Sequence, residues 1–278
     1  KTTLIEINRI MLGHERRFVE PVHKSLIDDG VNIVENTFVN RVEKDKADIK
    51  LHLSSGKVLL VSDLLIAAGR VPNIEQLGLE QAGVKYNEFG VTVDRNLRTT
   101  NKLVYAIGDI VEGSRFTHTA SYHAGIVLKK ILLGLPSKLR TDHIPQVTYT
   151  DPEIASVGIN FEDAVKRFGK KVERSCVNLK TNDRAITDSK TEGFVEVILI
   201  GRKVIGCSIT SKNAGELISF WAFVIAKSIK ISNINAMVAP YPTLGEVNKR
   251  VVGEYYAPKV FGNKLLKLYV AVIQKILK

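Results

Sequence analysis

Two continuous apolar runs, each ended by a glycine, constrain the fold of this chain more than any other feature. Residues 64–69 read LLIAAG, and residues 103–109 read LVYAIGD. A short strand that is apolar on both faces is typical of a parallel sheet covered by helices on both sides. We therefore predict buried strands at 64–69 and 103–107, within an α/β architecture for this half of the chain.

The first residues predict a further piece of the same architecture. Residues 1–6 read KTTLIE, a short strand that ends in Glu6, and a helix is expected from Glu15 to Asp28. An acid at this position typically accepts hydrogen bonds from the ribose hydroxyls of a dinucleotide. An exposed strand-end acid is the alternative for Glu6. A glycine-rich phosphate turn should lie about 20 residues earlier, and the sequence holds none, so we expect incomplete Rossmann-type units.

The rest of the chain predicts two antiparallel arrangements. Three short alternating runs, near 38–43, 48–53 and 57–61, predict a meander. After Pro145, strands and helices mix without βαβ regularity, which predicts a separate α+β domain. Its expected strands lie near 146–149, 154–158, 172–178, 193–199 and 203–209, and its helices near 160–168 and 212–228.

Composition narrows the class of protein. Hydrophobic residues make up 45% of the 278 residues, and no uncharged apolar run is long enough to span a bilayer. The net charge of +11 comes without a recognisable nucleic-acid-binding motif, so we expect no nucleic-acid partner. Cys176 and Cys207 are too far apart for a CxxC pair or a metal site, and we expect both to be structural. This cysteine usage fits a cytoplasmic location.

The run that ends in Gly108 and Asp109 carries the strongest local signal for a site. A buried strand that ends in these residues places a carboxylate at the carboxyl end of a sheet, which is where ligands bind in open α/β sheets. Glycine permits close approach of a ligand to the backbone. The alternative for Asp109 is a helix or turn cap.

Several motifs, taken in order, resemble one family. They are AAGRVPN (67–73), LGLEQAGV (77–84), YAIGD (105–109), FTHTA (116–120) and TDPEIASVG (150–158). This order resembles the pyridine nucleotide–disulfide oxidoreductase family, closest to its mercuric-reductase-like and dihydrolipoamide-dehydrogenase branch, through about residue 256. The resemblance implies an FAD- and NAD-dependent oxidoreductase, with NADP not excluded. Electrons would pass from nicotinamide through flavin to a disulfide or another small-molecule acceptor.

The resemblance also implies which residues bind the flavin. Gly108 and Asp109 match the family's second flavin motif, in which the aspartate holds the ribitol chain of FAD. Phe116, Thr117 and His118 match the segment that passes the flavin ring, where N–H groups at a helix start stabilise negative charge on the reduced ring. Helix capping or packing is the alternative for His118.

The remaining matches concern domain organisation and the nicotinamide. Gly69 and Arg70 match the hinge between the NAD and FAD domains, and Glu6 matches the acid that favours NAD over NADP. The resemblance divides the chain into remnants of an NAD(P)-binding domain and of an FAD-binding domain, an α+β dimerisation domain, and a tail. The expected bounds are 1–70, 71–142, 143–258 and 259–278.

The resemblance further implies a homodimer formed through residues 143–258. Each subunit of such a dimer completes the partner's active site with a His-Pro-Thr stretch followed by a glutamate. Here Tyr241 stands at the histidine position and Glu246 at the glutamate position. Because tyrosine has a pKa of roughly 10, Tyr241 is a poor base at neutral pH but can donate a hydrogen bond. Interface packing is the alternative role for Tyr241.

Two of the family's motifs are missing from the sequence. It contains neither a GxGxxG turn nor a CxxxxC redox pair, and Cys176 and Cys207 fall in the expected dimerisation domain. We therefore expect that this chain alone does not turn over. The alternative to an enzyme portion is a non-catalytic dimerisation or scaffold module.

The last twenty residues form a separate feature. Residues 259–278 carry five lysines and no acid, with apolar residues at helical spacing, which predicts a basic amphipathic helix. Such a helix can lie on an anionic membrane surface. The alternative is a helix docked on its own domain or on a dimer partner.

Overall fold

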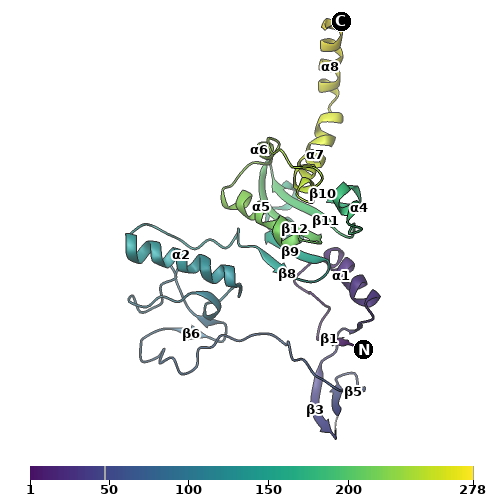
Figure 1. The fold of residues 1–278 in the computed structure, drawn as a ribbon. Coiled ribbons are helices and arrows are strands. Elements are labelled where there is room, and N and C mark those ends of the chain that lie inside the picture. The colour runs from purple at the N-terminus through teal and green to yellow at the C-terminus, as the bar shows by residue number, and fades with distance from the viewer. Residues whose placement is uncertain (47, 278) are drawn as a thin grey trace. The chain divides into compact units, whose positions relative to one another are not determined.

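The computed structural model describes residues 1–46 and 48–277 and divides into two compact units, each of which is described by itself. Unit 1 comprises residues 1–64 and 147–278, and unit 2 comprises residues 65–146. Figure 1 labels the elements of both units along the chain. Among the described helices, none combines the length and the apolar composition needed to cross a bilayer.

A five-stranded sheet forms the centre of unit 1. Its strand order is β10-β11-β12-β9-β8, and neighbouring strands from β10 to β9 run antiparallel. The strands are Gln146–Thr148 (β8), Glu153–Gly158 (β9), Val172–Asn178 (β10), Phe194–Ile200 (β11) and Lys203–Ser211 (β12). All five lie where the sequence predicts strands, which confirms the expected α+β character of this region.

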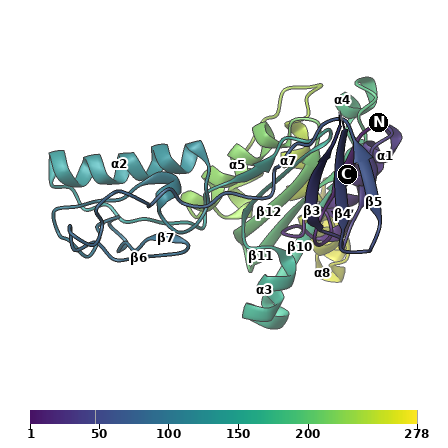
Figure 2. The same cartoon turned by 90° about the horizontal axis from the view of Figure 1, so that it is seen from below.

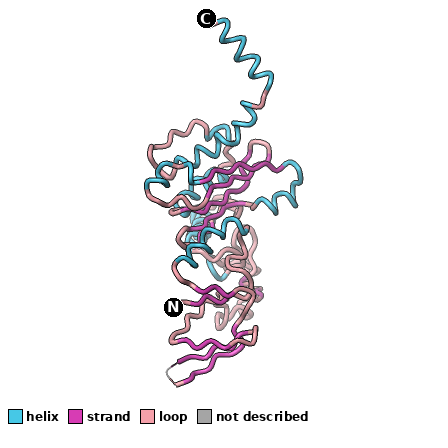
Figure 3. The backbone as a smooth tube through the Cα atoms, turned by 90° about the vertical axis from the view of Figure 1, so that its right-hand side faces the viewer, coloured by secondary structure: helices cyan, strands magenta, loops and turns pink. Residues whose placement is uncertain are grey.

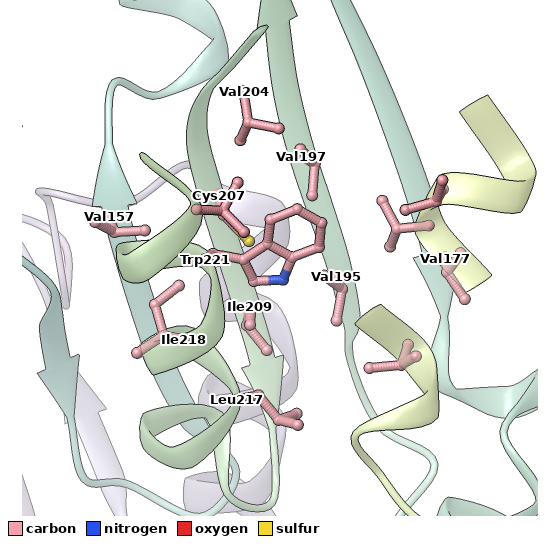
Figure 4. Close-up of a cluster of buried hydrophobic side chains, with 14 of the residues drawn as sticks. Val157, Val177, Val195, Val197, Val204, Cys207, Ile209, Leu217, Ile218 and Trp221 are labelled. Carbon is pink, nitrogen blue, oxygen red and sulfur yellow. The ribbon is translucent and has the colours of Figure 1, made fainter. Parts of the chain in front are cut away.

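One face of the sheet packs against the helices α5 (Ala214–Ala226) and α7 (Glu246–Phe261). Trp221 of α5 is fully buried there, and Figure 4 shows its ring among side chains of β11 and β12, including that of Cys207. The indole Nε1 donates a hydrogen bond of 2.8 Å to Oδ1 of Asn248 on α7. A buried Trp N–H needs an acceptor, and this bond supplies one while linking the two helices across the core.

The other face of the sheet packs against α1 (Arg16–Asp28). The rings of Phe18 and Phe194 lie 4.5 Å apart, and Oγ1 of Thr210 donates to the carbonyl of Phe18 at 2.9 Å. The carboxylate of Glu196 on β11 is almost fully buried, and the guanidinium of Arg17 donates a hydrogen bond to it. The contact therefore combines apolar packing with a charge pair that supplies the buried acid with a partner.

Helix α1 belongs to a parallel β-α-β unit. Strands β1 (Thr3–Ile5) and β2 (Asn32–Val34) pair in parallel, and α1 connects them. A meander follows, made of β3 (Val39–Asp45), β4 (Asp48–Leu53) and β5 (Val58–Val61), which Figure 2 shows side by side. Both arrangements confirm the sequence predictions for these residues.

Unit 2 contains mostly irregular chain around one long helix. Its elements are β6 (Tyr86–Asn87), β7 (Gly90–Val91), the 3₁₀ turn η1 (Gly108–Ile110) and α2 (Thr117–Leu133). The helix confirms the prediction for residues 119–132. A small core lies beside it, formed by Val84, Val91, Ala106 and Val111.

The two apolar runs that predicted buried strands are not strands. Residues 64–69 are irregular chain with Leu65 90% exposed, and within 103–107 only Tyr105 forms an isolated bridge, to Arg98. A parallel strand needs hydrogen-bonded neighbours, and among the described residues no parallel sheet extends to either run. The strand prediction was therefore wrong, because apolar sequence alone does not supply the partner strands.

The remaining helices of unit 1 are α3 (Phe161–Phe168), α4 (Asp183–Thr187), α6 (Ile231–Ile234) and α8 (Lys264–Ile276). The tail predicted as one helix over 259–278 is divided: α7 ends at Phe261, and α8 begins after Asn263. Figure 3 shows the short loop between the two helices. The side chain of Asn263 accepts hydrogen bonds from the N–H groups of Leu265 and Leu266, which is a strong signal for a new helix start.

We expect Arg17→Met to destabilise unit 1 by about 3 kcal/mol, because it removes the cation that hydrogen-bonds the buried carboxylate of Glu196 and leaves only Arg174, whose guanidinium lies 3.8 Å away. The double variant Arg17→Met/Glu196→Leu should recover most of that loss, since it removes both charges. Trp221 is the one tryptophan of the sequence, so urea unfolding followed by its fluorescence reports on this unit.

The matched control is Arg16→Met on the same helix. The side chain of Arg16 is 83% exposed and forms a surface pair with Glu20 at 3.8 Å. Its removal should change the free energy of unfolding by less than about 0.5 kcal/mol. Equal effects of the two single variants would contradict a special role for the Arg17–Glu196 pair.

Candidate functional site

Gly108 and Asp109 form a tight corner at the start of η1, in contact with α2. Gly108 has a φ of 73°, which L-amino acids rarely adopt, and a Cβ added there would lie 3.1 Å from the Cβ of Ala120 on α2. Both the backbone angle and the close approach therefore favour glycine at this position. The corner places the backbone of residues 108–110 directly against the first turn of α2.

His123 holds this corner in place from inside the helix. Its side chain is 5% exposed, and its Nδ1 accepts a hydrogen bond of 3.2 Å from the backbone N–H of Gly108. Burial lowers the pKa of His123 below its ordinary value, which favours the neutral ring with an unprotonated Nδ1. The histidine is therefore an acceptor that fixes the position of Gly108.

Asp109 pairs with Arg70, which is itself bonded to Arg115. Nη1 of Arg70 lies 3.2 Å from Oδ2 of Asp109, and Nη2 of Arg70 donates to the carbonyl of Arg115 at 2.6 Å. The guanidinium of Arg115 in turn donates to the carbonyl of Arg70. The Asp109 side chain remains 51% exposed, so its carboxylate can accept further hydrogen bonds. Gly69 precedes this cluster with a φ of 114°.

The start of α2 presents unpaired backbone donors beside the corner. A helix leaves its first N–H groups without an intrahelical acceptor, and Phe116, which precedes Thr117, provides no side-chain cap. Thr119 is buried at the same end, and its Oγ1 has no hydrogen-bond partner among the described residues. These groups together favour an electronegative ligand atom at the helix start.

His118 does not cap the helix. Its ring stacks on that of Phe116 at 5.1 Å between centroids, and its Nε2 lies 2.8 Å from the carbonyl of Pro145. The histidine therefore links the start of α2 to the chain near residue 145 within unit 2. This position is closer to the packing alternative than to the capping one.

Tyr241 and Glu246 lie near each other in unit 1. The hydroxyl of Tyr241 donates to Oδ2 of Asp183 at 2.9 Å, and this bond, with the charge of Asp183 and a smaller effect of Glu246, raises the pKa of Tyr241. Glu246 begins α7; its Oε1 accepts from Nε of Arg250 at 3.3 Å, and its Oε2 is buried without a partner in the described chain. The phenol of Tyr241 is 71% exposed and thus accessible.

The two cysteines are separate from both clusters. They lie on β10 and β12, on opposite sides of β11, and both are free thiols. Burial raises the pKa of Cys176, and it raises the pKa of the fully buried Cys207 well above the ordinary value. Because the thiolate is the nucleophile, neither thiol is activated for disulfide chemistry.

Glu6 lies at the end of β1 in unit 1, as predicted. One of its carboxylate oxygens accepts a hydrogen bond of 3.1 Å from the backbone N–H of Asn8. Its backbone also bonds to Val34 and Thr37. Glu6 therefore stabilises the turn after β1 and keeps its second carboxylate oxygen available.

Sequence reasoning missed the residues that support the site. His123 supports Gly108, Arg115 supports Arg70, and Asp183 orients Tyr241. Only His123 carried a sequence signal, since it lies on the same helix as Phe116 two turns later. The other two contacts join segments more than 40 residues apart in sequence.

The chain is similar to known proteins of one family over most of its length. A family model described as pyridine nucleotide-disulphide oxidoreductase matches residues 1–124, and the model of that family's dimerisation domain matches residues 144–252. Mercuric reductase from Bacillus cereus is 31% identical over 259 residues, which cover 91% of this chain and 41% of that protein. Dihydrolipoyl dehydrogenase from Geobacillus stearothermophilus is 32% identical over 256 residues, which cover 89% of this chain and 54% of that protein. The chain thus spans about half the length of these relatives.

Solved structures show the same fold. LpdA from Mycobacterium tuberculosis superimposes with a TM-score of 0.85 at 24% identity, covering 91% of this chain and 56% of that one. The HOCl-induced flavoprotein disulfide reductase RclA from Escherichia coli gives a TM-score of 0.81 at 25% identity, with 91% and 59% covered. These values support the mixed α/β fold of the partial first domain and of the dimerisation domain.

We expect the free energy of unfolding to decrease as the pH drops, because His123 titrates. Its pKa is lowered in the folded state, so the unfolded state takes up the proton first as the pH drops. The contribution is complete above a pH of about 6.5 and is lost below it, by up to about 1.4 kcal/mol per pH unit. Urea unfolding followed by circular dichroism at about pH 5.5 and about pH 7.5 measures this change.

His123→Asn is the comparison variant, because an amide oxygen can accept the Gly108 N–H without titrating. Burial also lowers the pKa of His14, but His14 is present in both proteins, so its contribution cancels in the difference. The wild type should lose more stability than His123→Asn between the two pH values. Identical losses would contradict a neutral, hydrogen-bonded His123.

Proposed function

Because the chain belongs to the pyridine nucleotide-disulphide oxidoreductase family, we propose that it forms the C-terminal portion of an oxidoreductase that uses FAD and NAD(P)H. In the whole enzyme, electrons would pass from nicotinamide through flavin to a disulfide or a related acceptor. The observation that carries the proposal is the corner at Gly108 and Asp109, which lies against the uncapped start of α2.

The residues of this corner fit a flavin nucleotide. The half-exposed carboxylate of Asp109 can accept hydrogen bonds from ribitol hydroxyls, and Gly108 leaves the backbone open to close approach. The N–H groups at the start of α2, with the unpaired Oγ1 of Thr119, favour a group that gains negative charge. FAD, when bound, would supply the redox chemistry.

The proposal also concerns the protonation state of Tyr241 in the dimerisation domain. The phenol of Tyr241 stays protonated at neutral pH because its pKa is raised, so it does not serve as a base. Its hydroxyl donates its proton to Asp183, which leaves the oxygen able to accept a hydrogen bond from substrate. Asp183 orients the hydroxyl through this direct bond, and the charge of Glu246 makes a smaller contribution to the raised pKa. Chemistry that requires a histidine base here is disfavoured.

We propose that Glu6 takes part in nicotinamide binding through its available carboxylate oxygen, which favours NAD over NADP. Gly69, with its positive φ, and Arg70 would form the hinge between the two nucleotide domains. The proposed division into residues 1–70, 71–142, 143–258 and 259–278 follows the same family pattern.

A second candidate function is a non-catalytic dimerisation or scaffold module. It is favoured by the two cysteines, whose raised pKa values leave the 278 residues without an activated thiol. For both the oxidoreductase portion and the scaffold module, we propose that these residues alone do not reduce a disulfide substrate.

We expect the purified chain to bind added FAD and to shift the flavin absorbance spectrum. Asp109→Asn should weaken this binding about tenfold, because the amide replaces a charged acceptor of hydrogen bonds. The matched control is Glu112→Gln, which also removes one negative charge on an exposed side chain three residues away. Flavin titration followed by absorbance or fluorescence gives the dissociation constants.

A folded chain whose spectrum does not change with added FAD would favour the scaffold function. Equal weakening by Asp109→Asn and Glu112→Gln would point to a general charge effect and contradict a specific role for Asp109. Circular dichroism of each variant establishes that it is folded.

We also propose that the chain forms a homodimer through residues 143–258. Light scattering should then give twice the 30.8 kDa of one chain. Val238 is 87% exposed close to Tyr241, so Val238→Asp should shift the equilibrium toward the monomer. Val165→Asp, the same change on α3, is the control and should leave the mass unchanged. A monomeric wild type would refute the homodimer.

A further inference from the structure

Helix α8 has two chemically distinct sides. With 100° between successive residues, its larger apolar side chains occupy more than half of the circumference and its lysines occupy the remainder. The apolar side consists of Leu265, Leu266, Leu268, Tyr269, Val270, Val272, Ile273 and Ile276. The opposite side consists of Lys264, Lys267, Ala271, Gln274 and Lys275. The helix contains no acidic residue.

The apolar side is not used for packing within the chain. No residue of α8 is buried, and Leu265, Leu268 and Ile276 are 77%, 64% and 72% exposed. By contrast, α5 buries six side chains in the core of the same unit. Helix α8 contacts α7, and Figure 1 shows it in yellow, extending from α7 away from the sheet. A folded domain rarely exposes a contiguous apolar surface of this kind without a partner.

Helix α8 is also separate from the dimerisation domain of the family. The matching family model ends at residue 252, and α8 begins at Lys264 after the Asn263 cap. Its amphipathic pattern is therefore not explained by packing in the core of that domain. The helix has its own start signal and its own surface chemistry.

We propose that α8 binds the surface of an anionic lipid membrane, with its apolar side in the interface and its lysines toward the headgroups. The charge of the helix is complementary to such a surface: Lys264, Lys267 and Lys275 form no ion pair within the described chain. The thirteen residues of α8 are too few to span a bilayer, which leaves the interfacial orientation.

Pairing of α8 with a second copy fits the same surface less well. A two-helix seam uses a narrow apolar stripe flanked by charges of both signs. Here the apolar side is broad and all the charges of the helix are positive. Two such helices would bring lysines together without acids to pair with them, whereas anionic lipid headgroups supply the opposite charge.

The test is co-sedimentation of the full chain with vesicles. Vesicles of phosphatidylglycerol and phosphatidylcholine in equal parts should bring the protein into the pellet, and vesicles of phosphatidylcholine alone should bind at least tenfold less. Added salt should weaken binding to the anionic vesicles, because it screens the lysines.

Three variants separate the two sides of the helix. Leu265→Gln/Val272→Gln removes apolar surface without changing the charge and should weaken binding on the order of a hundredfold. Ala271→Gln places the same side chain on the basic side and should leave binding unchanged within about twofold. Lys267→Gln/Lys275→Gln should weaken binding to anionic vesicles on the order of tenfold and reduce its salt dependence. All these positions are exposed, so circular dichroism should show an unchanged fold.

Two outcomes would overturn the proposal. The first is the absence of pelleting with anionic vesicles, or equal pelleting with both vesicle types, while the protein is folded. The second is a wild-type oligomer that Leu265→Gln/Val272→Gln dissociates in light scattering, with no vesicle binding; that result would assign the apolar side to a second copy of the chain. Neither outcome depends on flavin binding.

Discussion

The antiparallel sheet of unit 1 has two faces of different chemistry, and the rest of that unit depends on this difference. Along β11, Val195 and Val197 point into the core with Trp221, while Phe194 and Glu196 point toward α1. Successive side chains of a strand point to opposite faces of the sheet, so alternate residues of β11 face different partners. The apolar face needs only shape complementarity, whereas the other face contains a buried carboxylate and therefore requires a cation. Arg17 of α1 donates a hydrogen bond to this carboxylate, and Arg174 of β10 forms a second, longer ion pair with it.

The same principle, a buried polar group that needs a partner, organises the corner at Gly108 in unit 2. The N–H of Gly108 is buried against α2, and His123 supplies its acceptor. The neutral ring is favoured because burial lowers the pKa of His123. Asp109, by contrast, stays half-exposed beside Arg70 and keeps free acceptor capacity. The corner thus combines a rigid interior with an accessible carboxylate, which suits a binding site.

The proposed functions divide over different elements of the chain. The proposed flavin corner lies in unit 2, Tyr241 in the dimerisation domain, and the proposed lipid-binding surface on α8. The neutral phenol of Tyr241 donates its proton to Asp183, and neither cysteine is an activated nucleophile. These features support the proposal that the chain binds FAD but does not itself supply a redox-active thiol.

The sequence by itself determined the strands of the α+β domain and its helices α3 and α5, the first strand and helix of the chain, the meander and the family, because periodicity and motif order are local properties; it did not predict α4, α6 or the α7 residues before 259. It also determined the helical character of the tail, though not the break at Asn263. Only the tertiary structure decided that residues 64–69 and 103–107 are not strands, since a strand depends on neighbours that its own residues do not encode. It alone joined Arg17 to Glu196 and Tyr241 to Asp183, because such contacts link residues far apart in the chain. It also decided that the apolar side of α8 is exposed, because burial depends on what the fold places opposite a helix and not on its amphipathic pattern.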